Sequence, residues 1–212
     1  MKKVKTPKYA ARVAEQAALE QFKERLLAAT FDDEPAYFKS NKDDWETPDN
    51  FFAALNERYR FTLDVCASAD NTKCKRFFTK EDDALAQDWD KDVCWMNPPY
   101  GRHISEWLHH ARIAAGLGAT VVALLPARTD TAWWHEHVMR RSSEVYFVKG
   151  RLKFKGAASS APFPSAVVVW RPKPRTGTIG GTVAPEEQPR VLTLNRDGSL
   201  IEAPSSKNLW IL

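Results

Sequence analysis

The chain contains few cysteines: three in 212 residues, at Cys66, Cys74 and Cys94. Their number is odd and no two of them form a Cys-x-x-Cys pair, so the sequence indicates neither a disulfide framework nor a zinc site. The histidines also lack the spacing of metal ligands, and we predict no metal site. This cysteine usage is typical of a reducing compartment, which predicts a cytoplasmic protein.

Long hydrophobic runs are missing as well. No apolar stretch reaches the length of a transmembrane helix, and the first residues, MKKVKTPKYAARVAEQ, lack the apolar core of a signal peptide. We therefore expect no membrane partner. The formal net charge is +4, which permits a nucleic-acid partner without requiring one.

Composition and pattern divide the chain into three parts. Residues 1–40 are rich in helix formers and are predicted to form a helical arm. In residues 41–172 short apolar runs alternate with helical or loop segments, which favours an α/β domain whose sheet is covered on both faces. Residues 173–212 begin with a stretch rich in Pro and Gly and are predicted to be a linker and C-terminal tail, with a small hairpin that turns at Asp197–Gly198.

The stretch NPPY follows the apolar run VCWM, which is predicted to be a buried strand. Pro98 and Pro99 prevent the strand from continuing and fix the turn. Asn97 and Tyr100 are therefore held at the carboxyl end of a strand, where ligands bind in open α/β sheets. One amide and one aromatic side chain in a rigid turn indicate a flat substrate that is both hydrogen-bonded and stacked.

Other motifs place polar residues near the ends of predicted elements. Asp64 follows the apolar run FTL at a strand tip, where solvation alone explains a carboxylate poorly. Asp83 lies in the acidic run EDD, where a solvated charge or a helix cap explains it as well as a functional role does. Thr47 and Pro48 suit the start of a helix, because threonine can cap it and proline fits its first turn.

Five motifs stand in the order WETP, LDVCAS, DDALAQDW, NPPYG and PARTDTAWWH, and as a set they resemble the phage-type DNA N-6-adenine methyltransferases, the Dam-like family. The resemblance covers about residues 40–171. It implies an enzyme that depends on S-adenosylmethionine and has a Rossmann-like α/β sheet with helices on both faces. It also implies double-stranded DNA as the partner and, for a phage-encoded protein, the cytoplasm of the host cell as the location.

The resemblance assigns catalysis to the NPPY turn. The exocyclic amine of adenine is a poor nucleophile because its lone pair is delocalised into the ring. The side-chain oxygen of Asn97 and the carbonyl oxygen of Pro98 are expected to accept the two amine hydrogens, while Pro99 keeps the turn rigid. Tyr100 is expected to stack on the base. Because the stacked duplex hides these contacts, the target adenine is expected to flip out.

For the cofactor, the resemblance points to residues around the first strand. Asp64 is expected to receive the methionyl amino group of S-adenosylmethionine, and Asp83 to contact its adenine amine. The turn after the first strand lacks the usual glycines, so small residues must let the cofactor approach. Thr47 and Pro48 are expected to line the cofactor entrance, although a role in starting the helix explains these two residues equally well. The predicted cofactor site is completed by Thr47, Pro48, Ala67 and Ser68.

Two further segments are candidates for DNA contacts. In PARTDTAWWHEHVMRR, Arg128 is a candidate phosphate ligand, and Trp133 or Trp134 a candidate wedge between bases. An alternative of equal weight places both tryptophans in the core.

In KGRLKFKG, cations alternate with Leu152 and Phe154, which predicts a strand with Arg151 and Lys153 on one DNA-facing side. Phe154 also matches a position at which related methyltransferases place an aromatic against the flipped base. Packing within the strand explains Phe154 equally well.

Methyl transfer to adenine N6 in DNA is the predicted function, with two alternatives. The NPPY turn suits other planar amines and amides, so methylation of RNA adenine or of a protein glutamine amide is the first. The basic KGRLKFKG segment favours nucleic acid over protein. A non-catalytic DNA-binding module of the same fold is the second, since the cofactor turn is unusual.

Overall fold

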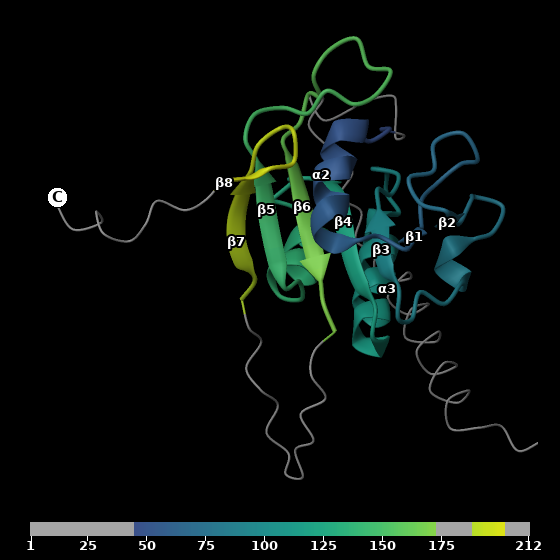
Figure 1. The fold of residues 1–212 in the computed structure, drawn as a ribbon. Coiled ribbons are helices and arrows are strands. Elements are labelled where there is room, and N and C mark those ends of the chain that lie inside the picture. Colours follow the sequence, from purple (N-terminus) through teal and green to yellow (C-terminus); the bar gives the residue numbers. More distant parts are fainter. Residues whose placement is uncertain (1–44, 173–187, 202–212) are drawn as a thin grey trace, which may run out of the picture. The chain divides into compact units, whose positions relative to one another are not determined.

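One eight-stranded mixed sheet organises the part of the chain that the structure describes (Figure 1). The computed structural model describes residues 45–172 and 188–201, so the predicted helical arm, residues 1–40, lies outside them. The strands are β1 (Leu63–Asp64), β2 (Arg76–Phe77), β3 (Val93–Met96), β4 (Thr120–Pro126), β5 (Glu144–Val148), β6 (Ser165–Trp170), β7 (Arg190–Leu194) and β8 (Leu200–Ile201). The helices are α2 (Asp49–Tyr59), α3 (Ile104–Leu117), the 3-10 turn η2 (Ala84–Ala86) and the π-helix η3 (Trp134–Met139).

The strand order is β2-β1-β3-β4-β6-β5-β7-β8. The first four strands are parallel neighbours. Strand β6 is antiparallel to both β4 and β5, and β7 is parallel to β5, so β5 and β7 run in the direction of β4. The carboxyl ends of β1, β3, β4, β5 and β7 therefore share one edge of the sheet. The order reverses between β1 and β3, and ligands bind at such reversals in α/β sheets.

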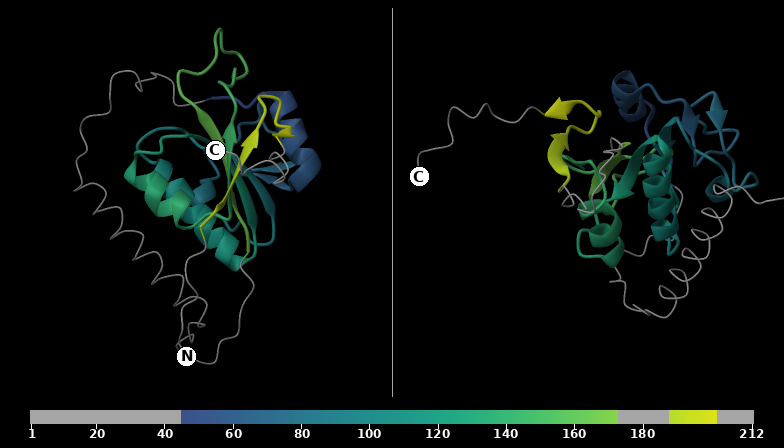
Figure 2. Two further views of the ribbon diagram at one scale, coloured as in Figure 1. Left: turned by 90° about the vertical axis from the view of Figure 1, so that its left-hand side faces the viewer. Right: turned by 90° about the horizontal axis from the view of Figure 1, so that it is seen from below.

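The middle of the sheet is apolar and covered on both faces, which confirms the predicted α/β class. Strand β4 reads TVVALLP, and its residues from Val121 to Leu125 are fully buried. Continuous apolar strands of this kind are typical of sheets between two layers. Figure 2 shows α2 on one face of the sheet and α3 with η3 on the other. Strand β3 ends at Met96, because the prolines that follow Asn97 remove backbone donors.

The helix predicted to start at Thr47–Pro48 is present, and a second α-helix follows the NPPY turn. Helix α2 begins at Asp49, directly after Pro48, but no side chain caps it, so the capping explanation for Thr47 is wrong. Helix α3 ends before Gly118, whose positive φ of 122° favours glycine. None of the helices in the described residues is long and apolar enough to cross a membrane. The face that α2 buries consists of Phe51, Phe52, Leu55 and Tyr59.

The segment KGRLKFKG is not the strand that the sequence predicted. Strand β5 ends at Val148, and residues 149–156 form a loop. The alternation survives, since Leu152 and Phe154 are each 1% exposed while the cations between them are exposed. The loop leaves the sheet at Gly150, which has a φ of +83°. In this segment, the alternation of apolar and basic residues therefore corresponds to an extended loop with one buried side, not to a strand.

The predicted hairpin in the tail is confirmed, and it belongs to the main sheet. Strands β7 and β8 pair antiparallel around a turn at Asp197–Gly198, and β7 pairs with β5. The boundary predicted at residue 172 thus leaves out two strands of the sheet. At Gly198 φ is +88°, and a Cβ atom would lie 2.9 Å from the carbonyl oxygen of Phe51, so the turn requires glycine to pack on α2.

Candidate active site

A cleft of about 910 Å³ lies at the carboxyl edge of the sheet, between the ends of β1 and β3. Its volume is in the range of cofactor and small-molecule sites. The cleft brings together eight residues predicted from the sequence: Thr47, Asp64, Ala67, Ser68, Asp83, Asn97, Pro98 and Pro99. Sequence reasoning missed other lining residues, including Trp45, Glu46, Asn71, Lys73, Phe78, Trp107 and Lys155.

The amide of Asn97 is held from both of its ends. Its Nδ2 donates to the carbonyl oxygen of Trp45 and, at 3.1 Å, to Oγ1 of Thr47, which is 2% exposed. Its Oδ1 accepts a hydrogen bond of 2.8 Å from the hydroxyl of Tyr100. Because a carbonyl oxygen can only accept, the Trp45 contact fixes which end of the amide is the NH₂ group. Oδ1 keeps a second lone pair for another donor.

Tyr100 is buried beside the cleft. The single proton of its hydroxyl is shared between Oδ1 of Asn97, at 2.8 Å, and the carbonyl oxygen of Leu124, at the longer distance of 3.2 Å. Its ring meets that of Phe163 edge to face, with the ring centroids 5.7 Å apart. Burial raises the pKa of Tyr100 well above its ordinary value, so the hydroxyl stays a donor. Trp45, Tyr100, Phe154 and Phe163 form an aromatic cluster. Stacking of Tyr100 on a base stays a prediction.

Asp64 stands at the end of β1 and is 3% exposed. Its Oδ1 accepts the backbone N–H of Cys66 at 3.1 Å, and its Oδ2 accepts that of Lys73 at 3.0 Å. Burial raises the pKa of Asp64 above its ordinary value of 3.8, and the two backbone donors oppose that rise. The carboxylate thus shapes the loop after β1, and it faces the cleft with its remaining lone pairs.

The loop after β1 closes without glycine. The backbone N–H of Ala67 donates to the carbonyl oxygen of Phe78 at 3.0 Å, and that of Ser68 donates to Oδ1 of Asn71 at 2.7 Å. Cys66 also lines the cleft, and burial raises the pKa of its thiol well above the ordinary value. The thiol is therefore protonated at neutral pH and poorly suited to act as a nucleophile.

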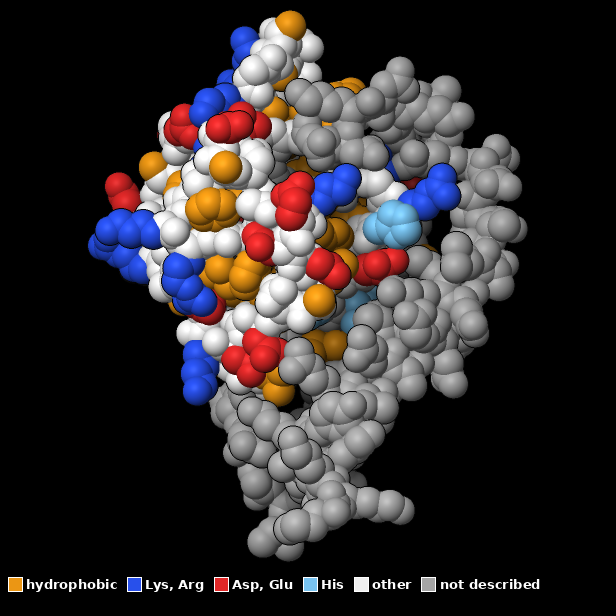
Figure 3. Space-filling view, turned by 90° about the vertical axis from the view of Figure 1, so that its right-hand side faces the viewer, with side chains coloured by type: hydrophobic (Ala, Val, Ile, Leu, Met, Phe, Trp, Pro, Cys, Tyr) orange, Lys and Arg blue, Asp and Glu red, His pale blue; other side chains and the backbone are white. Residues whose placement is uncertain are grey.

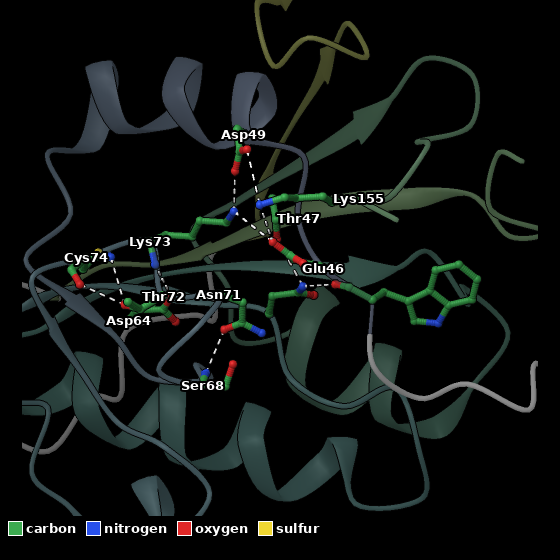
Figure 4. A network of polar contacts seen from close by, with 12 residues as sticks. Glu46, Thr47, Asp49, Asp64, Ser68, Asn71, Thr72, Lys73, Cys74 and Lys155 are labelled. Carbon is green, nitrogen blue, oxygen red and sulfur yellow. Dashed lines mark hydrogen bonds and ion pairs between the residues drawn. The ribbon is translucent and has the colours of Figure 1, made fainter. Parts of the chain in front are cut away.

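Two lysines and two carboxylates form an ion-pair network at the cleft (Figure 4). Nζ of Lys155 lies 2.9 Å from Oε1 of Glu46 and 3.6 Å from Oδ2 of Asp49. Nζ of Lys73 binds the other oxygen of Asp49 and lies 3.6 Å from Glu46. The hydrogen bond that Lys73 donates to Asp49 lowers the pKa of Asp49. The hydrogen bond that Lys155 donates to Glu46 raises the pKa of Lys155. The network joins α2, the loop after β1 and the loop after β5.

The remaining predicted site residues lie at the rim of the cleft or away from it. Pro48 immediately precedes α2 and is half-buried. Asp83 is exposed, adopts a φ of +48° and precedes η2 at the rim of the cleft. Arg128 and Trp133 are half-buried, whereas Trp134 is 1% exposed and stacks on Phe147 at 6.2 Å. The burial of Trp134 makes it a core residue, so the prediction of a DNA wedge at Trp134 is wrong.

The sequence is similar to known proteins over most of the domain. The model of a family described as DNA N-6-adenine-methyltransferase (Dam) matches residues 36–190. A DNA N-6-adenine-methyltransferase of Haemophilus phage HP1 (strain HP1c1) is 32% identical over 148 residues, which are 66% of this chain and 86% of the relative. One of Escherichia phage T1 is 32% identical over 120 residues, or 52% of this chain and 47% of the relative. Putative methyltransferase YfdM of Escherichia coli (strain K12) is 42% identical over 74 residues, or 31% of this chain and 81% of that protein.

Proposed function

The chain belongs to the DNA N-6-adenine-methyltransferase family, and from this membership we infer that it transfers a methyl group to the N6 amine of adenine in DNA. One structural observation supports this inference chemically. The NPPY turn places an oriented amide, that of Asn97, on the wall of a cleft of about 910 Å³ that also contains the buried carboxylate of Asp64.

S-adenosylmethionine is the proposed methyl donor, and the donor set of the cleft fits it. Asp64 offers a buried carboxylate to an ammonium group, the small side chains of Ala67 and Ser68 leave room beside it, and Asp83 stands at the rim for an adenine amine. Bound there, the cofactor supplies a methyl carbon on a sulfonium sulfur, which departs as a neutral thioether. The reversal of strand order between β1 and β3 supports a Rossmann-like arrangement of the parallel strands.

Asn97 and Pro98 are the proposed catalytic acceptors. The free lone pair of Oδ1 of Asn97 and the carbonyl oxygen of Pro98 would each accept a hydrogen bond from one N–H of the target amine, which makes its lone pair available for attack on the methyl carbon. The methylated nitrogen would then release one proton to solvent. Pro99 restricts the backbone of the turn. The protonated Cys66 thiol supports direct transfer without a covalent enzyme intermediate.

Thr47 is the proposed positioning residue of this site. Its hydroxyl and the Trp45 carbonyl oxygen hold Nδ2 of Asn97, and the Tyr100 hydroxyl holds Oδ1. An amide that is hydrogen-bonded at both ends is preorganised toward the amine. Preorganised dipoles of this kind stabilise the charge that develops in the transition state without having to reorient. Thr47 also lines the cleft, as expected for the cofactor entrance.

Recognition of the substrate is proposed to involve base flipping, since an amine inside a duplex cannot reach the cleft wall. Tyr100 is the proposed stacking residue for the flipped base. Phe154 is 1% exposed and packs within the aromatic cluster, so its proposed role is to support the Tyr100 ring rather than to contact the base. Arg128, Trp133, Arg151 and Lys153 are the proposed DNA contacts outside the cleft. A DNA substrate also supports a cytoplasmic location, that of the host cell for a phage-encoded protein.

The test is transfer of tritium from methyl-labelled S-adenosylmethionine to unmethylated DNA, to RNA and to a glutamine-containing protein, followed by nucleoside and amino-acid analysis. We expect label in N6-methyladenine from DNA. Label only in RNA or in glutamine would assign the alternative substrates, and the absence of cofactor binding would assign a non-catalytic module.

A further inference from the structure

A row of exposed cations leads from the β7–β8 hairpin to the rim of the cleft. Lys149, Arg151 and Lys153 belong to the loop after β5, and Arg196 to the turn after β7. Strands β5 and β7 run in the direction of β3, so these residues emerge at the same edge of the sheet as Asn97. We call these four cations the basic strip.

The hairpin and the loop are in direct contact. The backbone N–H of Lys149 donates to the carbonyl oxygen of Leu194 at 2.8 Å. A Cβ atom at Gly150 would lie 3.3 Å from Cδ of Arg196, so the arginine side chain crosses the loop at this glycine. At the other end of the loop, the backbone N–H of Lys155 donates to the carbonyl oxygen of Glu46 at 2.9 Å. The loop thus connects Arg196 to the cleft.

The charges of the basic strip are available to a ligand. Within residues 45–172 and 188–201, no carboxylate forms an ion pair with any of the four, whereas Lys155 pairs with Glu46 and Asp49. The carboxylate of Asp197, next to Arg196, accepts instead from the backbone N–H and the hydroxyl of Ser199, at 2.9 and 2.7 Å. On the side where β2 lies, basic and acidic side chains are interspersed (Figure 3).

We propose that the basic strip binds the phosphate backbone of the duplex that flanks the target adenine, with Arg196 of the hairpin at its far end. The proposal rests on the proposed function, which brings adenine to the cleft. Lys149 and Lys155 are six positions apart in the chain, a reach of at most ~22 Å, which is enough to follow several phosphates of one strand. The segment beyond residue 172, outside the motifs that indicate catalysis, thereby contributes to DNA binding.

The experiment compares Arg196→Gln with Arg190→Gln. Arg190 is an equally exposed arginine at the opposite end of β7, so it is a matched control on the far edge of the sheet. Binding of a fluorescent mixed-sequence DNA duplex is measured by anisotropy from ~50 to ~200 mM salt. We expect Arg196→Gln to reduce the slope of log affinity against log salt by about 1, Arg190→Gln to leave it unchanged, and Arg196→Lys to restore it.

The outcomes separate this proposal from the proposed function. An unchanged slope for Arg196→Gln overturns the basic strip as a phosphate site, even when the wild-type protein methylates adenine in DNA. Absence of methyl transfer to DNA by the wild-type protein overturns the proposed function instead. Tighter binding of an RNA hairpin than of the duplex, lost in Arg196→Gln but not in Arg190→Gln, overturns DNA as the partner. Urea unfolding of each variant establishes that it is folded.

Discussion

Oγ1 of Thr47 lies 3.1 Å from Nδ2 of Asn97, fifty residues away along the chain. Thr47 was expected to cap α2 or to line the cofactor entrance; it lines the cleft, and its hydroxyl accepts a hydrogen bond from the Asn97 side chain rather than capping the helix. The contact is buried, since Thr47 is 2% exposed. The WETP motif therefore contacts the NPPY turn directly, in addition to preceding helix α2.

Replacing Thr47 by valine removes this acceptor while keeping the shape of the side chain. An unpaired buried donor costs about 1–3 kcal/mol, part of which falls on the transition state. We expect kcat to fall about tenfold, the affinity for S-adenosylmethionine to change little, and Thr47→Ser to restore the rate. A parallel loss of cofactor affinity, measured by titration calorimetry, would instead place Thr47 in the cofactor site.

Tyr100→Phe keeps the aromatic ring and removes the donor to Oδ1 of Asn97. If the hydroxyl orients the amide, single-turnover methyl transfer should slow by about five- to tenfold, roughly the loss of one neutral hydrogen bond. If Tyr100 acts only through its ring, the rate should be unchanged. Tyr100→Leu, which removes the ring as well, provides the comparison for stacking.

The pH dependence of cofactor binding follows from Asp64. Burial raises the pKa of this carboxyl above 3.8, so as the pH falls it takes up a proton earlier than an exposed aspartate. In the proposed site the cofactor ammonium pairs with the ionised form, so the affinity for the cofactor should decrease as the pH is lowered from neutrality through that pKa. Asp64→Asn should bind the cofactor at least tenfold more weakly and lose this pH dependence. An identical pH profile for the variant would exclude Asp64 as the ammonium partner.

Gly198 is expected to be the glycine on which the hairpin depends. An alanine there adopts a φ of +88° and meets the Phe51 carbonyl oxygen at 2.9 Å, so Gly198→Ala should lower the free energy of unfolding by about 2 kcal/mol or more. Gly116→Ala is the control, because nothing lies within 4 Å of its Cβ in α3, and it should raise that free energy by ~0.5–1 kcal/mol. Urea unfolding measures both, and equal effects would contradict the packing of the hairpin on α2.

Features set by neighbours in the chain could be predicted from the sequence. Pro98 and Pro99 end β3, the apolar run of β4 forms a buried strand, and Asp197–Gly198 turns a hairpin. Each depends on interactions within a few residues or on one-dimensional burial, which the sequence displays directly.

Features set by distant partners could not be predicted. The partners of Thr47 and of Lys155 become visible only when segments far apart in the sequence meet at one edge of the sheet. Leu152 and Phe154 alternate with cations because one side of this loop is buried. A half-buried strand shows the same alternation, so the sequence alone does not distinguish the two. The pairing of β7 with β5 likewise depends on which edge of the sheet is open.

The central claim is that the oriented amide of Asn97 activates the adenine amine. It is tested most directly by Asn97→Ala, with the single-turnover rate of methyl transfer to DNA and the affinity for S-adenosylmethionine measured on the same preparation. We predict a loss of transfer of at least about a hundredfold, with cofactor affinity within about threefold of wild type. Retained transfer, or an equal loss of both quantities, would contradict it.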